Sequence, residues 1–305
     1  MKSSNQFPPL PLNEWEDSKK TLHLYCQIVG KIRMELSPPQ NHWWHVPLYV
    51  NTQGLETGSI PNQNHRFEIN FNFIDHRIAV STSLGDEKRF NLHDGLSVAD
   101  FYQKLFSILD DFNIKADILA KPYDQPFNTP FAEDREHARY DKKYVERYWH
   151  ILAETDRIFK IFNRNFCGKA CPVQLYWHSF DLALTRFSGR EAPPMPDAGP
   201  VDQEAYSHEV ISFGFWAGDE DLRNPAFYSY TYPAPGGLDE MPLKPESAEW
   251  VEQNGSPMAL LMYDDVRNAE NPEQTLLDFL ESAYRVGAEK ADWNMEKLNR
   301  KAFSA

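Results

Sequence analysis

The stretch RFEINFNFID, residues 66–75, decides the fold class of this chain. Apolar residues stand at every second position and polar residues fill the positions between them, a period that places the apolar side chains on one face of a β-strand. Residues 74–77 then have the composition of a turn, and residues 78–83 that of a strand returning beside the first. The stretch therefore predicts an antiparallel sheet with an aromatic inner face.

Helical patterns bracket this pair of strands. Apolar residues recur at helical spacing over residues 17–36 and again over residues 97–111, where Ser97 is the predicted N-cap. Short strands are predicted at residues 45–50 and 114–119. Because strands come in consecutive runs between helices and do not alternate with them, we predict an α+β fold with largely antiparallel sheets.

The second part of the chain repeats this plan. The heptapeptide PQNHWWH at residues 39–45 is echoed by PVQLYWH at residues 172–178, and each copy precedes a run of strand patterns. Residues 208–215 repeat the alternation of the opening stretch, and residues 227–232 repeat its return strand. We therefore predict a tandem duplication of a helix–antiparallel strands–helix unit, with two halves related by a pseudo-twofold axis and a cleft between them.

Composition shifts suggest the boundaries of the two repeats. Prolines and charges mark a linker between them, and two Pro-rich insertions in the second repeat, residues 192–200 and 233–257, are predicted to be surface loops. The predicted segments are a first repeat at residues 14–122, a linker at 123–140, a second repeat at 141–291 and a tail at 292–305.

Charge and cysteine content limit the classes of partner. The net charge is -14 without a block of Lys and Arg, which argues against nucleic acid and anionic membranes as partners. No apolar run is long enough to span a membrane, and the N-terminus lacks the pattern of a signal peptide. Three cysteines cannot all pair with one another, which favours a reducing compartment, so a cytoplasmic location is predicted. The sequence leaves the oligomeric state open.

Four segments carry a family resemblance: NHWWHVPLYV at residues 41–50, FIDHR at 73–77, SFDLALTRFSGR at 179–190 and AYSHE at 205–209. Together they resemble an uncharacterised bacterial family, catalogued as a domain of unknown function, whose members are similar in length to this chain. The resemblance extends from Trp15 to about Gly287. It implies a soluble bacterial protein that forms one continuous unit, and it implies no particular activity.

Two histidines form the motif His42-x-x-His45, whose imidazoles are weak candidates for metal ligands. Residues three apart point to opposite faces of a strand, and a third ligand would have to come from Asp75, His76 or His208. A structural, hydrogen-bonded role is the alternative, so we predict no metal site and no cofactor.

A histidine and two carboxylates are the candidates for catalysis. His208 could act as a general base oriented by a carboxylate. Its neighbour Glu209 faces the other way on a strand, so Asp75 or Asp181 from another strand is the better partner. A serine nucleophile is disfavoured, since no G-x-S-x-G elbow occurs.

Arginines and aromatic residues are the candidates for ligand binding. Arg186 and Arg190 flank a Ser-Gly turn and could hold a carboxylate or phosphate, or could instead form an ion pair that locks the turn. The other candidate ligand-binding residues are His45, His76, Trp44 and Trp177.

Three functional hypotheses follow, and the sequence does not decide whether the protein is an enzyme. The first is a small-molecule binding protein or enzyme with its site in the cleft between the repeats. The second is a non-catalytic interaction or structural protein that uses its Pro-rich loops. The third is a metal-dependent hydrolase.

Overall fold

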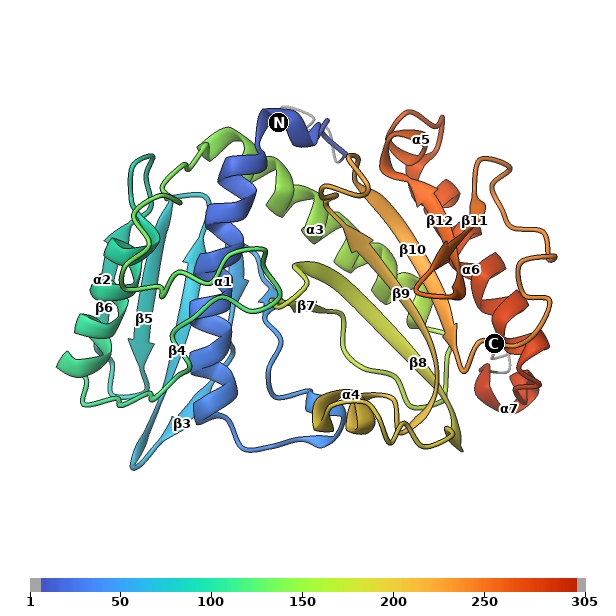
Figure 1. Cartoon of the computed structure of the whole chain (residues 1–305), viewed down its shortest axis with the longest axis horizontal. Coiled ribbons are helices and arrows are strands. Elements are labelled where there is room, and N and C mark those ends of the chain that lie inside the picture. The colour runs from blue at the N-terminus through green and yellow to red at the C-terminus, as the bar shows by residue number, and fades with distance from the viewer. Residues whose placement is uncertain (1–6, 301–305) are drawn as a thin grey trace, which may run out of the picture.

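The computed structural model describes residues 7–300 and contains two six-stranded sheets in which every strand pair is antiparallel (Figure 1). The first sheet has the order β1-β2-β4-β5-β6 with β3 beside β4, and comprises β1 (Tyr49–Val50), β2 (Gly54–Glu56), β3 (Ile60–Asn62), β4 (His65–Asn72), β5 (Arg77–Thr82) and β6 (Glu87–Asn91). The second has the order β11-β12-β10-β9-β8-β7, and comprises β7 (Gln174–Tyr176), β8 (Asp181–Glu191), β9 (His208–Trp216), β10 (Ala226–Tyr232), β11 (Glu249–Gln253) and β12 (Ser256–Met262). The α+β prediction is confirmed.

One pair of helices packs on each sheet. The helices are α1 (Glu16–Leu36), α2 (Val98–Asp111), α3 (Lys142–Asn163), α4 (Pro200–Ala205), α5 (Tyr263–Arg267), α6 (Pro272–Lys290) and α7 (Met295–Leu298), with 3-10 turns η1 (Leu12–Glu14) and η2 (Asn41–Trp43). The pair α1 and α2 packs on the first sheet, and the pair α3 and α6 packs on the second sheet. None of the helices among residues 7–300 is both long and apolar enough to cross a membrane.

The aromatic face of β4 packs on α1 and α2, as the opening stretch predicts. Tyr25 of α1 stacks on Phe101 of α2 with ring centroids 4.1 Å apart, and Phe101 in turn lies 6.3 Å from Phe71 of β4. Ser97 caps α2 by accepting the backbone N–H of Asp100 at 3.1 Å. The apolar residues at every second position of β4 therefore form the face of the first sheet that packs on α1 and α2.

The second sheet is built in the same way. Phe162 of α3 packs edge-on against Phe213 of β9 at 4.9 Å, and Tyr284 of α6 lies 6.4 Å from Phe162. Figure 1 shows α3 behind β8, β9 and β10. Both halves therefore run in the order helix, meander of strands, helix. That a duplication produced this order stays a prediction.

The echoed heptapeptides do not occupy equivalent positions. The first forms η2, where His42 and Trp43 have φ of 57° and 60°, left-handed values that cannot continue a strand. The second forms β7 and the turn after it. The residues that do face each other are Leu48 and Leu175, which exchange backbone hydrogen bonds of 2.9 and 2.7 Å and join the edges of the two sheets.

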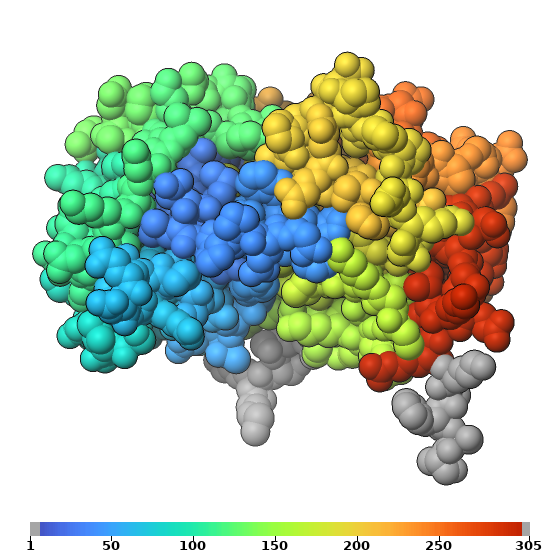
Figure 2. Space-filling view, turned by 90° about the horizontal axis from the view of Figure 1, so that it is seen from below, coloured from blue at the N-terminus to red at the C-terminus, as the bar shows by residue number. Residues whose placement is uncertain are grey.

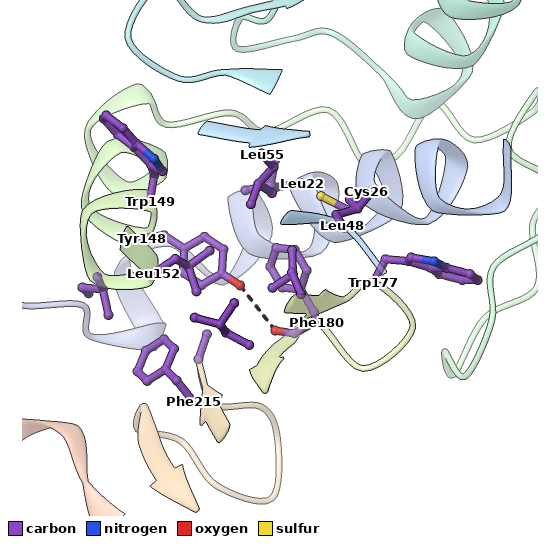
Figure 3. Close-up of a cluster of buried hydrophobic side chains, with 14 of the residues drawn as sticks. Leu22, Cys26, Leu48, Leu55, Tyr148, Trp149, Leu152, Trp177, Phe180 and Phe215 are labelled. Atoms are coloured by element: carbon purple, nitrogen blue, oxygen red, sulfur yellow. Dashed lines mark hydrogen bonds between the residues drawn. The ribbon is translucent and has the colours of Figure 1, made fainter. Parts of the chain in front are cut away.

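One core runs through both halves (Figure 3). Leu22 and Cys26 of α1 lie in it with Leu48 from the sheet junction. Tyr148 of α3 lies in the same core, and its hydroxyl donates to the carbonyl of Phe180 at 3.3 Å. The halves are therefore packed as one unit.

Three predicted segments differ from what the structure shows. Residues 114–119 form no strand. The predicted linker packs against the first half: Phe131 is fully buried, and the carbonyl of Asp134 accepts the N–H of Ala99 in the first turn of α2. The insertion at residues 233–257 includes β11 and the start of β12, so only part of it is loop. Of the predicted tail, residues 301–305 lie outside the described residues.

Candidate functional site

The candidate residues of the first half lie away from those of the second. Asp75 pairs with Arg77 at 3.2 Å in the turn between β4 and β5. The ring of His76 is held between the hydroxyl of Tyr140 at 3.2 Å and Glu146 at 3.0 Å. Asp75 and His76 therefore each have local partners in the first sheet, and neither orients His208 in the second.

Arg186 lies on the helix-covered face of the second sheet and does not face solvent. Its guanidinium stacks 3.6 Å from the Phe162 ring centroid, and it donates to the Phe162 carbonyl at 2.7 Å and to Asn163 at 3.1 Å. Burial lowers the pKa of Arg186 to about 10. The planar cation of Arg186 is therefore already stacked and hydrogen-bonded within the protein.

Arg190 lies near the end of β8, where the pairing of that strand with β9 is irregular. It pairs with Glu209 at 2.8 Å and donates to the carbonyls of Ala291 and Asp292 just past the end of α6. A cation at a helix C-terminus is favourable there because the last carbonyls lack partners within the helix.

Substitution separates the roles of these two arginines. We expect Arg186→Ala to lower the free energy of unfolding by about 3 kcal/mol, since it removes hydrogen bonds to a charged group and stacking on buried rings. Arg190→Ala, at a half-exposed site, is expected to cost less than about 1 kcal/mol. Urea denaturation of both variants measures this difference, and equal costs would contradict it.

The two histidines of the H-x-x-H motif have separate protein partners. His42 Nε2 lies 2.6 Å from Lys169 Nζ, and its Nδ1 lies 3.1 Å from the carbonyl of Glu204. His45 Nδ1 accepts the N–H of Gln40 at 3.2 Å. Residues 7–300 contain no group of three His, Cys, Asp or Glu side chains that could hold a metal ion.

The two tryptophans among the candidates differ in position. Trp177 is buried against α1, and its indole N–H donates to the carbonyl of Val46 at 3.0 Å. Trp44 is half-buried, and Lys169 Nζ lies 5.2 Å from its ring centroid. His208 lies close by, with its ring 5.4 Å from His42.

A cavity of about 450 Å³ does lie between the halves, but it contains none of the predicted site residues. Asp156 and Lys160 on its wall already pair with each other at 2.6 Å. Its lining residues are Tyr49, Val50, Glu56, Asp156, Lys160, Asn163, Arg164, Cys171, Pro172, Val173 and Leu184.

The open faces of the two sheets, opposite their helix pairs, differ sharply in composition. The first is charged, as expected for a face in water; the residues that register places there include Arg66, Glu68, Arg77, Glu87 and Arg89. The open face of the second sheet, over β7–β10, includes the cross-strand partners from Tyr176 to Phe187. Asp181 is the one charged side chain among them. We call this surface the tyrosine face, defined by Gln174, Tyr176, Asp181, Ala183, Thr185, Ser212, Gly214, Tyr228 and Tyr230.

Tyr228 crosses the tyrosine face to reach Asp181. It starts on β10, lies over Gly214 of β9, and its hydroxyl donates to Asp181 Oδ2 on β8. A Cβ on Gly214 would lie 2.2 Å from Tyr228 Cζ, so the glycine is what lets the ring lie flat. Asp181 is 9% exposed and has Ser179 and Tyr228 as its hydrogen-bond partners.

Other hydroxyl groups continue this network. Tyr206, at the end of α4, has its hydroxyl 2.9 Å from that of Tyr230, and Thr185 Oγ1 lies 3.0 Å from Ser212 Oγ. Burial raises the pKa of Tyr228 and of Tyr230 well above the usual value, yet both rings keep part of their surface accessible. The phenols thus stay protonated and able to donate hydrogen bonds.

A four-residue turn between β7 and β8 carries Ser179 and His178 to one edge of this face. Phe180 in that turn has φ of 60°, an unfavourable value for an aromatic residue. Its ring stacks on His23 at 4.8 Å, and its N–H donates to the carbonyl of Tyr176 at 2.8 Å. The surrounding core holds the turn in this conformation, which fixes the positions of Ser179 and Asp181.

Of the candidates, Asp181 belongs to the tyrosine face. Trp44 and His208 lie nearby, at the end of the second sheet where β9 begins. Sequence reasoning did not select Gly214, Ser179 or the tyrosines as site residues. The signal available was the spacing of Tyr228, Tyr230 and Tyr232 at every second position of one strand, which places three phenols on one face.

Comparison with known proteins agrees with the resemblance noted from the motifs. A model of a family of unknown function (DUF5996) matches residues 7–300. No curated protein and no solved structure matches the chain. The match spans nearly the whole sequence, so the chain belongs to the family of unknown function DUF5996.

Proposed function

We propose that the protein binds a small organic molecule on the tyrosine face, and that this molecule carries hydroxyl or ammonium groups. One observation supports this above all: the open face of the first sheet is charged over β4–β6, whereas the tyrosine face of the second sheet, over β7–β10, consists of phenols, small residues, a glutamine and a single buried carboxylate. Aromatic side chains stabilise a protein when another group covers them. Aromatic rings on an open sheet face therefore indicate a surface that binds something other than water.

The chemistry of the tyrosine face favours a ligand that donates hydrogen bonds. Asp181 is a carboxylate without a Lys or Arg partner among the described residues. Gln174 Oε1 is a buried acceptor that has no hydrogen-bond partner anywhere in residues 7–300. An unpaired buried acceptor is costly, and a ligand donor would satisfy it. Aromatic rings beside a carboxylate also suit an organic cation.

The rim of the tyrosine face combines both halves. Tyr123, the first residue of the predicted linker, is held to α1 of the first half by hydrogen bonds of its backbone with the Gln27 side chain. Its ring lies 6.0 Å from that of His178, and Tyr123 is 56% exposed. At the end of the tyrosine face beside α4, η2 of the first half packs against α4, and His42 contacts the carbonyls of Glu204 and Ala205. Figure 2 shows these blue and gold segments side by side on the lower surface. This arrangement supports a site to which both halves contribute.

Three molecules of the same shape and different charge test the proposal. Choline is a cation with a hydroxyl group, 3,3-dimethylbutan-1-ol is its neutral counterpart, and 3,3-dimethylbutanoate is an anion. We expect saturation-transfer NMR to rank their binding in that order. Asp181→Asn is expected to weaken choline binding about tenfold, because the substitution removes the negative charge that attracts the quaternary ammonium.

Asp75→Asn is the matched control, because Asp75 is a carboxylate in a turn of the other sheet. It should leave choline binding unchanged. Preferred binding of the anion, or equal effects of the two substitutions, would rule the proposal out.

The alternative of an interaction protein that uses its Pro-rich loops has less support. The second insertion supplies β11 and part of β12, and the first leads into α4 beside the tyrosine face. Both insertions are therefore tied into the second half.

A further inference from the structure

Hydrogen bonds at the turn between β7 and β8 fix which nitrogen of His178 carries a proton. Ser179 Oγ lies 2.7 Å from Asp181 Oδ1, and because a carboxylate only accepts, the single hydroxyl proton of Ser179 points at Asp181. The same oxygen lies 3.1 Å from His178 Nδ1, to which it can then offer only a lone pair. Nδ1 is therefore the protonated nitrogen, and Nε2 of the neutral ring is left with a free lone pair.

The position of His178 keeps that lone pair available. Its Nε2 has no hydrogen-bond partner among residues 7–300, and the side chain is only partly buried. The carbonyls of Trp177 and His178 lie 2.8 and 3.2 Å from His23 Nε2, which ties the backbone of the turn to α1. The ring lies 5.6 Å from that of Tyr176, a member of the tyrosine face.

We propose that His178 is a general base for the molecule bound on the tyrosine face, with Ser179 and Asp181 as positioning residues. In this step a hydroxyl O–H bond of the bound molecule breaks, its electron pair stays on the oxygen, and the proton forms a bond to Nε2. The resulting imidazolium is stabilised through Ser179 by the negative charge of Asp181. The proposal rests on the proposed function only for the place of the bound molecule.

The groups around His178 leave it neutral before the step. Burial lowers its pKa, while the carboxylates of Asp181, Asp124 and Asp202 oppose that shift. The other titratable side chains near the ring are His23 of α1, Tyr123 and Tyr176. A neutral imidazole with a fixed tautomer is the form that can accept a proton.

NMR of protein with ¹⁵N-labelled histidine tests the tautomer without any ligand. We expect the His178 signals to show protonated Nδ1 and unprotonated Nε2 at neutral pH. Ser179→Ala removes the acceptor for Nδ1–H from an exposed position, so the variant should fold and should shift His178 toward the Nε2–H form. A wild-type ring with its proton on Nε2, or a Ser179→Ala variant with an unchanged tautomer, overturns the proposal.

Acylation by diethyl pyrocarbonate tests whether Nε2 accepts a bond. The imidazole nitrogen attacks a carbonyl carbon of the reagent, an N–C bond forms, and the departing ethyl carbonate breaks down to ethanol and carbon dioxide. Peptide mass spectrometry follows His178 and the exposed His150 in the same sample. We expect Ser179→Ala to slow acylation of His178 at least fivefold and to leave His150 unchanged, whereas equal rates for wild type and variant would contradict the proposal.

Choline then connects the base to the bound molecule. Saturating choline should protect His178 from acylation at least fivefold in the wild type, without protecting His150. If choline and its neutral counterpart do not bind the wild-type protein at all, the proposed function has failed, while the tautomer and acylation results still judge His178. If choline binds and His178 is not protected, this inference alone is overturned.

Discussion

Gly30→Ala is expected to destabilise the protein by about 3 kcal/mol, the upper range for overpacking a well-filled core. A Cβ at this position in α1 would lie 2.2 Å from Cδ1 of the buried Trp177 indole. Intrinsic helix propensity has the opposite sign, because alanine in a helix interior is favoured over glycine by about 1 kcal/mol. The clash should win, since Trp177 is also fixed by its hydrogen bond to Val46. Chemical denaturation measures the net effect.

Gly236→Ala is the control for this prediction. Beyond its two neighbours in the chain, no atom would lie within 4 Å of a Cβ at Gly236, and the substitution should leave the free energy of unfolding nearly unchanged. A Gly30→Ala variant as stable as the wild type would mean that Trp177 can move away at little cost.

Gly214→Ala is expected to have the largest effect on the tyrosine face. The new methyl group would lie 2.2 Å from Cζ of the Tyr228 ring, so it would displace the ring and separate the phenol from Asp181. We expect choline binding to fall about tenfold or more, the equivalent of at least one hydrogen bond to a charged group, together with a loss of stability of about 1–3 kcal/mol from overpacking. Saturation-transfer NMR and urea denaturation measure the two effects separately.

Tyr228→Phe separates the ring from its hydroxyl group. This variant keeps the ring over Gly214 and removes only the donor to Asp181. It should weaken choline binding less than Gly214→Ala does, and adding Tyr228→Phe to Gly214→Ala should have little further effect. Full additivity of the two substitutions would show that Tyr228 and Gly214 act independently.

Local sequence patterns predicted most of the elements because each depends on neighbours along the chain. The alternation in residues 66–75 became β4, and Ser97 became the cap of α2. The echo misled because matching letters do not ensure matching φ angles, and His42 adopts a left-handed value that a strand residue does not. Local pattern therefore determined the class and the element order, and left the register between the halves undetermined.

The candidate site was less predictable because it depends on strand pairing across long separations. Asp181 and Tyr228 are 47 residues apart, and they meet only because β9 lies between β8 and β10 with Gly214 at the crossing point. The same register turns Arg186 to the helix-covered face, so a residue five positions from Asp181 has a purely structural environment. Neither outcome can be derived without the order of strands in the sheet.

The backbone bridge between Leu48 and Leu175 also bears on aggregation. Exposed sheet edges can pair with other chains, and natural sheets protect them with charge or by covering them. The outer edge strands β6 and β11 carry charged residues, whereas β1 and β7 carry none and shield each other through this bridge. A half produced alone would expose an uncharged edge, so the junction protects both sheets from self-association as well as joining them.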